Sequence, residues 1–77
     1  MRVAFDLNSG GRVRLGVFDV AGRMVQSLAD EAMEGQRHYQ LSWSGSDHAG
    51  KRARPGLYFI RLEAEGKLES RPVILQR

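Results

Sequence analysis

The chain has 77 residues, which corresponds to a single domain. It contains no cysteine, so a disulfide framework and cysteine-based zinc sites are excluded. No apolar run approaches the ~18 residues that a membrane-spanning helix needs, and the net charge of +3 permits anionic partners without requiring them.

Apolar and polar residues alternate along four stretches of the chain, at residues 3–7, 13–17, 39–43 and 58–63. Each stretch has one apolar face and one mostly polar face, as strands half-buried in an antiparallel sheet do. Turn signals separate these stretches at residues 8–11, 19–22 and 64–67. Asp19 and Gly22 fit the first and last positions of a type I turn. The spacing of about ten residues between turns predicts a small sandwich or barrel.

Residues 23–35 are compatible with two structures. Apolar residues recur every four positions from Met24, which suits a short amphipathic helix. The interpretation that we favour is a strand over residues 23–28 with a bulge, followed by a loop over residues 30–36. This strand would cover the edge beside residues 13–17, which would otherwise stay unpaired.

The last apolar run, residues 67–75, contains Pro72. Proline cannot donate a hydrogen bond to a strand ladder. We therefore expect this run to be an edge strand or to bulge at Pro72.

Three motifs resemble one protein family. They are VFDVAGRMV at residues 17–25, W-x-G-x-D-x-x-G at residues 43–50 and PGLYFIRL at residues 55–62. Together with the terminal RPVILQR, they resemble the FlgD-like immunoglobulin-type domain, whose pattern is shared by the C-terminal sorting domains of type IX secretion cargo. The resemblance covers the chain from about residue 3 onward. The sequence departs from the family pattern at Ser44, where aspartate is usual, and lacks the Asn-Pro pair that often precedes the first strand.

The resemblance implies an all-β fold, an immunoglobulin-like β-sandwich of about six or seven mainly antiparallel strands. It implies that residues 1–77 are one domain, the C-terminal module of a larger exported protein. The start of the chain lacks a signal-peptide apolar region, so we expect any export signal on that longer parent. In this interpretation the motif residues shape turns and the core, namely Gly22, Trp43, Gly45, Asp47, Gly50 and Gly56.

The implied function is non-catalytic. The domain would direct export and cell-surface attachment of its parent, outside a bacterium or on its outer-membrane surface. The alternative is a structural assembly module of an extracellular appendage, like the immunoglobulin-type domain of the flagellar hook-capping protein. Protein partners are expected in both cases, as export machinery or as neighbouring domains and subunits, with homotypic assembly through edge strands in the second. No cofactor, nucleic acid or membrane span is expected.

Asp47 and His48 look like polar chemistry on a loop, but no nucleophile motif accompanies them. We expect Asp47 to accept backbone N–H groups of its own turn. His38 and His48 are ten residues apart and match no metal-ligand spacing, so no metal site is predicted. We interpret the basic run from Lys51 to Arg54 as a solvated turn rather than a phosphate site.

The candidate recognition residues lie on the predicted strands. Phe18 and Phe59 are aromatic residues on the polar faces of their strands, and an adjacent pair would form a small adhesive patch. The terminal strand offers further apolar and basic side chains. The complete candidate set is Phe18, Phe59, Arg61, Arg71, Val73, Ile74, Leu75 and Arg77.

Overall fold

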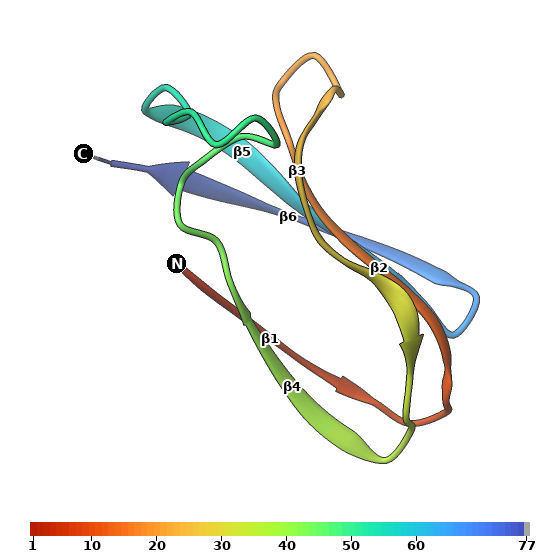
Figure 1. Cartoon of the computed structure of the whole chain (residues 1–77). Coiled ribbons are helices and arrows are strands. Elements are labelled where there is room, and N and C mark those ends of the chain that lie inside the picture. The colour runs from red at the N-terminus through yellow and green to blue at the C-terminus, as the bar shows by residue number, and fades with distance from the viewer. Residues whose placement is uncertain (77) are drawn as a thin grey trace.

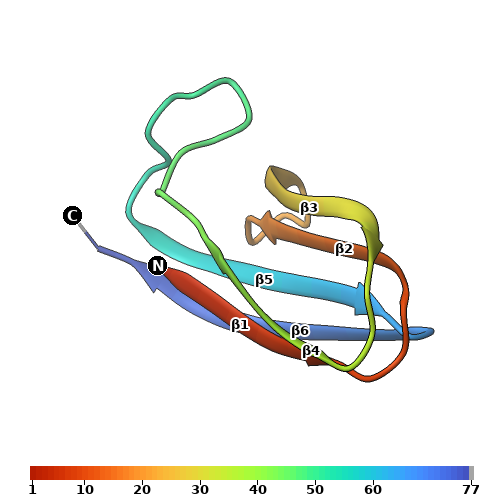
Figure 2. The same cartoon turned by 60° about the horizontal axis from the view of Figure 1, so that its bottom comes forward.

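Six antiparallel strands form two sheets in the computed structural model, which describes residues 1–76 (Figure 1). The strands are β1 (Arg2–Leu7), β2 (Gly11–Phe18), β3 (Met24–Met33), β4 (Arg37–Ser42), β5 (Gly56–Ala64) and β6 (Lys67–Leu75). One sheet has the order β3-β2-β5-β6, and the other contains only β1 and β4. The predicted all-β sandwich of mainly antiparallel strands is confirmed. The loop from β4 to β5 extends beyond the strands at one end of the sandwich (Figure 2).

The segment of ambiguous pattern is a strand, as favoured, but the predicted loop over residues 30–36 is wrong for its first half. β3 continues to Met33, because its backbone ladder with β2 runs on to the Gly11–Met33 pair; within it Asp30 lies opposite Arg14 and forms an ion pair with it. The register between β2 and β3 shifts twice, which leaves Val25 and Leu28 as extra residues on β3. Both extra side chains pack against the core. The apolar residues spaced by four do not share one face, because Leu28 packs against the core whereas Met24 and Ala32 lie opposite Phe18 and Arg12 on the outer face.

The proline-containing run is an edge strand, as predicted. In the part of the chain that the structure describes, β6 pairs with β5 alone, and its register continues through Pro72 without a shift. Proline is tolerated there because an edge strand needs ladder donors on one side only.

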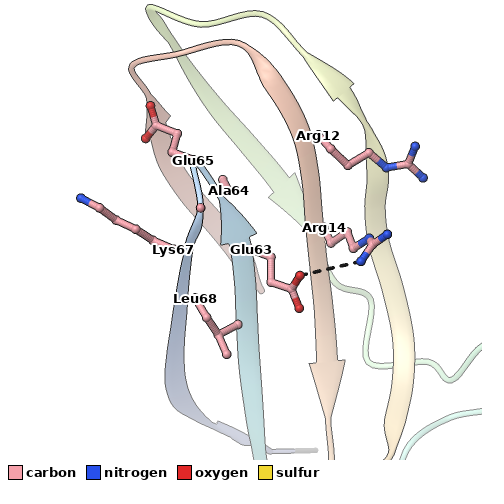
Figure 3. Close-up of a pocket in the computed structure, with 8 residues that line it drawn as sticks. Arg12, Arg14, Glu63, Ala64, Glu65, Lys67 and Leu68 are labelled. Carbon is pink, nitrogen blue, oxygen red and sulfur yellow. Dashed lines mark ion pairs between the residues drawn. The ribbon is translucent and has the colours of Figure 1, made fainter.

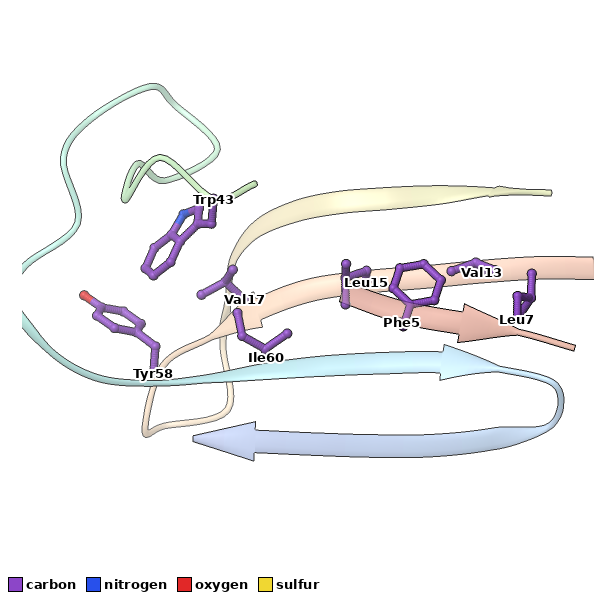
Figure 4. Packing of buried hydrophobic residues seen from close by; sticks show 8 residues of the cluster. All are labelled: Phe5, Leu7, Val13, Leu15, Val17, Trp43, Tyr58 and Ile60. Atoms are coloured by element: carbon purple, nitrogen blue, oxygen red, sulfur yellow. The ribbon is translucent and has the colours of Figure 1, made fainter. Parts of the chain in front are cut away.

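The core lies between the sheets and is built from the inward faces of the alternating strands (Figure 4). The buried side chains are Phe5, Leu7, Val13, Leu15, Val17, Trp43, Tyr58 and Ile60. Along β2, the alternate residues Val13, Leu15 and Val17 are essentially inaccessible to solvent, which agrees with the period of two in the sequence.

Trp43 closes one end of this core. Its ring meets the edge of Tyr58 at a centroid distance of 5.3 Å. Its indole Nε1–H donates to the carbonyl of Ser46 at 2.8 Å, so the buried polar group is satisfied. Tyr58 in turn donates its hydroxyl to the carbonyl of Arg54. The two aromatic residues thus fasten the β4–β5 loop to the sandwich.

Replacing Trp43 with phenylalanine removes the indole donor and leaves the Ser46 carbonyl without it. We expect the free energy of unfolding to fall by about 1–3 kcal/mol in urea titrations. Tyr39→Phe is the matched control, because it removes a solvent-exposed hydrogen bond to the carbonyl of Glu34. It should change stability by less than about 0.5 kcal/mol. Equal losses in the two variants would contradict this role for Trp43.

Candidate protein-interaction surfaces

The structure divides the candidate recognition residues between two faces of the four-stranded sheet. Phe18, Phe59, Arg61 and Ile74 point to the outer face, away from β1 and β4. The other candidates on β6 point to the inner side, toward the space between the sheets, and are Arg71, Val73 and Leu75. Arg77 lies outside the described residues.

Phe18 and Phe59 are direct cross-strand partners on the outer face. The guanidinium of Arg61 lies 4.1 Å from the centroid of the Phe18 ring, a cation–π contact. Gly16, which is opposite Arg61, makes room for this arrangement. A Cβ atom at Gly16 would lie 3.1 Å from the Phe18 ring and 3.4 Å from the Met24 methyl group, so these side chains lean over the glycine.

Three further residues extend this surface and were missed in the sequence. Met24 lies opposite Phe18, and Pro72 lies opposite Phe59, so one apolar row crosses all four strands. Leu57 pairs with Ile74 on the same face. We call the six residues Phe18, Met24, Leu57, Phe59, Pro72 and Ile74 the outer apolar patch.

The patch is open to solvent at its margins. Met24, Leu57 and Ile74 are 53%, 40% and 58% exposed, whereas the two phenylalanines are half-buried. Period two alone would have found Leu57 from Phe59. Met24 could not be assigned to this face from the sequence, because the bulges of β3 change which of its residues share a face.

The opposite end of the outer face is charged. Asp30 accepts from Arg12 at 2.7 Å and lies 3.4 Å from Arg14, which also reaches Glu63 at 3.8 Å. Figure 3 shows the last of these pairs beside a shallow hollow of about 470 Å³. The hydrogen bond from Arg12 is the main cause that holds the pKa of Asp30 below its usual value. Acidic and basic groups compensate one another here, and Leu68, opposite Glu63 and 60% exposed, adds one apolar side chain apart from the patch.

The Asp47 loop is a structural turn, as predicted. The Asp47 carboxylate accepts the backbone N–H groups of Ala49 and Lys51, both at 2.9 Å. His48 donates its backbone N–H to the carbonyl of Val25 at 2.8 Å, which attaches the loop to β3. The carboxylate is therefore engaged in shaping the loop.

The remaining polar candidates lie apart. His38 contacts Asp6 at 2.7 Å across the β1–β4 pair, whereas His48 is on the loop after β4. Within residues 1–76, no group of three His, Asp or Glu side chains is placed to hold a metal ion. The basic side chains Lys51, Arg52 and Arg54 are exposed on the same loop. The expected absence of catalysis, cofactor and metal stays a prediction.

No protein-family model matches this chain, and comparisons with curated proteins and with solved structures gave no significant match. The family resemblance based on the three motifs therefore stays a prediction. Among the described residues there is no helix long and apolar enough to cross a membrane.

Asp47→Ala tests the structural role of the loop carboxylate. Removing the acceptor of two backbone N–H groups should lower the free energy of unfolding by about 1–3 kcal/mol, measured by urea titration. Asp6→Ala is the control, because the Asp6 side chain is 78% exposed and contacts His38 alone among the hydrogen bonds described. Unchanged stability of Asp47→Ala would show that the carboxylate does not hold the loop.

The charged end of the outer face predicts a dependence on pH. The lowered pKa of Asp30 means that its carboxylate stabilises the folded state above the unfolded value of about 4. This contribution is lost as the pH falls through the lower folded pKa. The difference in melting temperature between the wild type and Asp30→Asn should therefore be present near neutral pH and vanish in strong acid.

The source of this effect is checked by nuclear magnetic resonance. Arg12→Gln should raise the titration midpoint of the Asp30 carboxyl carbon, because it removes the principal hydrogen-bond donor. An unchanged midpoint would exclude Arg12 as the cause.

Proposed function

We propose that this chain is a non-catalytic sorting and attachment module, located at the C-terminal end of a larger exported protein and read by a type IX-like export machinery. In this proposal the parent protein is delivered to the outer-membrane surface or the exterior of a bacterium. The role of the module is recognition, and chemistry belongs to the parent. The three family-like motifs suggest this class, and the outer apolar patch is the single observation that carries the proposal.

The patch suits a protein partner for physical reasons. A contiguous apolar area on the outside of a sheet is unfavourable in water unless another surface covers it. Phe18 and Phe59 lie on rigid, paired strands, so little side-chain freedom is lost on docking. Arg61 adds a cation beside the rings, which favours a partner that presents apolar side chains next to a carboxylate.

Assembly through edge strands, as in an appendage protein, is the weaker alternative. The edge strand β6 carries Pro72, which lacks a donor, and β3 carries two bulges. Both features hinder strand-to-strand association of like molecules. Homotypic assembly through the edges of the larger sheet is therefore disfavoured, and the outer apolar patch is the alternative contact surface that we test.

Export of a reporter fused to residues 1–77 tests the proposal in a type IX-competent bacterium. We expect the wild-type fusion at the cell surface and a fusion with Met24→Ser and Ile74→Ser retained in the periplasm. Both substituted residues are more than half exposed, so the fold should persist. A wild-type fusion retained in the periplasm would refute the sorting role.

The matched control carries Val20→Ser and Leu68→Ser, two similarly exposed apolar residues outside the patch. It should be exported like the wild type, and thermal unfolding should verify that both double variants fold. Equal export of the patch variant would refute the patch as the docking surface. Sedimentation separates the alternative, because self-association that disappears in the patch variant would favour homotypic assembly.

A further inference from the structure

The two-stranded sheet leaves β1 with an unpaired edge that borders a groove. Within residues 1–76, β1 pairs with β4 alone. The groove of about 220 Å³ is lined by residues of β1, β2, β5 and β6, and by none of β4. It therefore lies on the side of β1 that faces away from β4, with the inner side of β6 as its far wall.

The backbone of β1 is oriented to hydrogen-bond across this groove. The N-terminal amine of Met1 donates to the carbonyl of Trp43 at 3.0 Å, and the Trp43 N–H donates to the carbonyl of Met1 at 2.8 Å. Hydrogen-bonded and non-hydrogen-bonded pairs alternate along an antiparallel ladder. Met1 and Trp43 form a hydrogen-bonded pair, so the pairs that involve Arg2, Ala4 and Asp6 are the non-hydrogen-bonded ones. The N–H and C=O groups of these three residues therefore point away from β4, toward the open edge.

The interior of the groove is apolar and its rim is charged. Leu15, Ile60 and Leu62 form its floor, all buried or half-buried members of the core or packed against it. The rim carries Arg2, Arg71 and Glu69, all exposed, and so has one net positive charge. One ligand could therefore contact apolar side chains at the floor of the groove, unpaired backbone N–H and C=O groups of β1 at its side, and excess positive charge at its rim.

We propose that this groove is a binding site for a single extended peptide strand, which pairs with β1 and adds a third strand to the smaller sheet. A strand of about six residues matches the length of β1. Every second side chain of the strand would enter the space above Leu15, Ile60 and Leu62, where an aliphatic or β-branched side chain suits the apolar surroundings. An acidic residue is favoured opposite Arg71. This mode of binding uses backbone hydrogen bonds for affinity and alternate side chains for selectivity.

The position of β6 excludes a second copy of the folded chain from the groove. β6 already occupies the layer beneath the open edge of β1. If a second molecule paired its own β1 with this edge, its four-stranded sheet would lie in the layer that β6 occupies. The two molecules would therefore collide at β6. An isolated strand has no such second layer. The site also lies on the opposite face from the outer apolar patch, so it is independent of the proposed sorting role.

A tethered strand tests the proposal. An alternating valine–threonine strand is fused ahead of Met1 through a flexible glycine–serine linker, and a glycine–serine extension of equal length is the control. The tether supplies a high effective concentration, so an unoptimised strand suffices. We expect the valine–threonine extension to raise the melting temperature and to slow amide exchange of Ala4 about tenfold or more. Equal exchange in the two fusions would overturn the proposal.

A pair of proline variants locates the strand. Ala4→Pro removes a donor from the open edge of β1, while Gln40→Pro removes the corresponding donor from the far edge of its partner β4. In each proline variant, the melting temperature with the valine–threonine extension is compared with that of the same variant carrying the glycine–serine extension. The difference should disappear in Ala4→Pro and persist in Gln40→Pro. A gain that persists in Ala4→Pro would place the strand elsewhere and refute the site.

Charge reversal tests the acidic preference. Two extensions differ only at the inward position nearest Arg71, which is aspartate in one and lysine in the other. The aspartate extension should give the larger gain in the wild type, and Arg71→Glu should reverse the order. An unchanged order would refute the assignment of an acidic ligand residue.

Discussion

Burial of one face of β2 is the constraint from which the rest of the structure follows. Val13, Leu15 and Val17 are at most 1% exposed, and β2 is paired on both sides. Since side chains alternate across a strand, burying these three residues forces Gly16 and Phe18 to the outer face. The neighbouring strands must then present their own outward residues beside them. The outer apolar patch is the direct result of this register.

The unequal size of the two sheets determines where the molecule can interact. Four strands face two, so part of the inner side of the larger sheet lacks a strand above it. The edges of the larger sheet are protected by bulges on β3 and by Pro72 on β6. β1 carries neither device, and its open edge lies directly beside an apolar floor. The same architecture that protects the larger sheet leaves the smaller one able to accept a strand.

The two candidate surfaces differ in physical character. The outer patch is flat, rigid and built from side chains, so it would recognise the shape and charge of a folded partner. The groove combines side chains with unpaired backbone groups, so it would recognise an extended segment of suitable pattern. Because they lie on opposite faces of the larger sheet, a partner at one leaves the other accessible.

Much of the strand content could be predicted from the sequence, because alternation along residues 13–17 and 58–63 reports directly which side chains are buried. The turn roles of Asp19 and Asp47 were also readable, since an aspartate followed three residues later by glycine satisfies local hydrogen bonds within the turn itself. The motifs supply the functional expectation, which rests on residue identity rather than on geometry.

The tertiary structure decided everything that depends on pairing between distant residues. The end of β3 is set by its backbone ladder with β2, which runs to the Gly11–Met33 pair, and its bulges bring Met24 to the patch, which local pattern cannot reveal. Likewise, alternation alone places Arg71 and Ile74 on opposite faces of β6, but only the strand pairing makes one face border the groove and the other carry the patch. Local pattern encodes which face of a strand is apolar. Only the packing of strands against one another determines which faces and edges remain open to a partner.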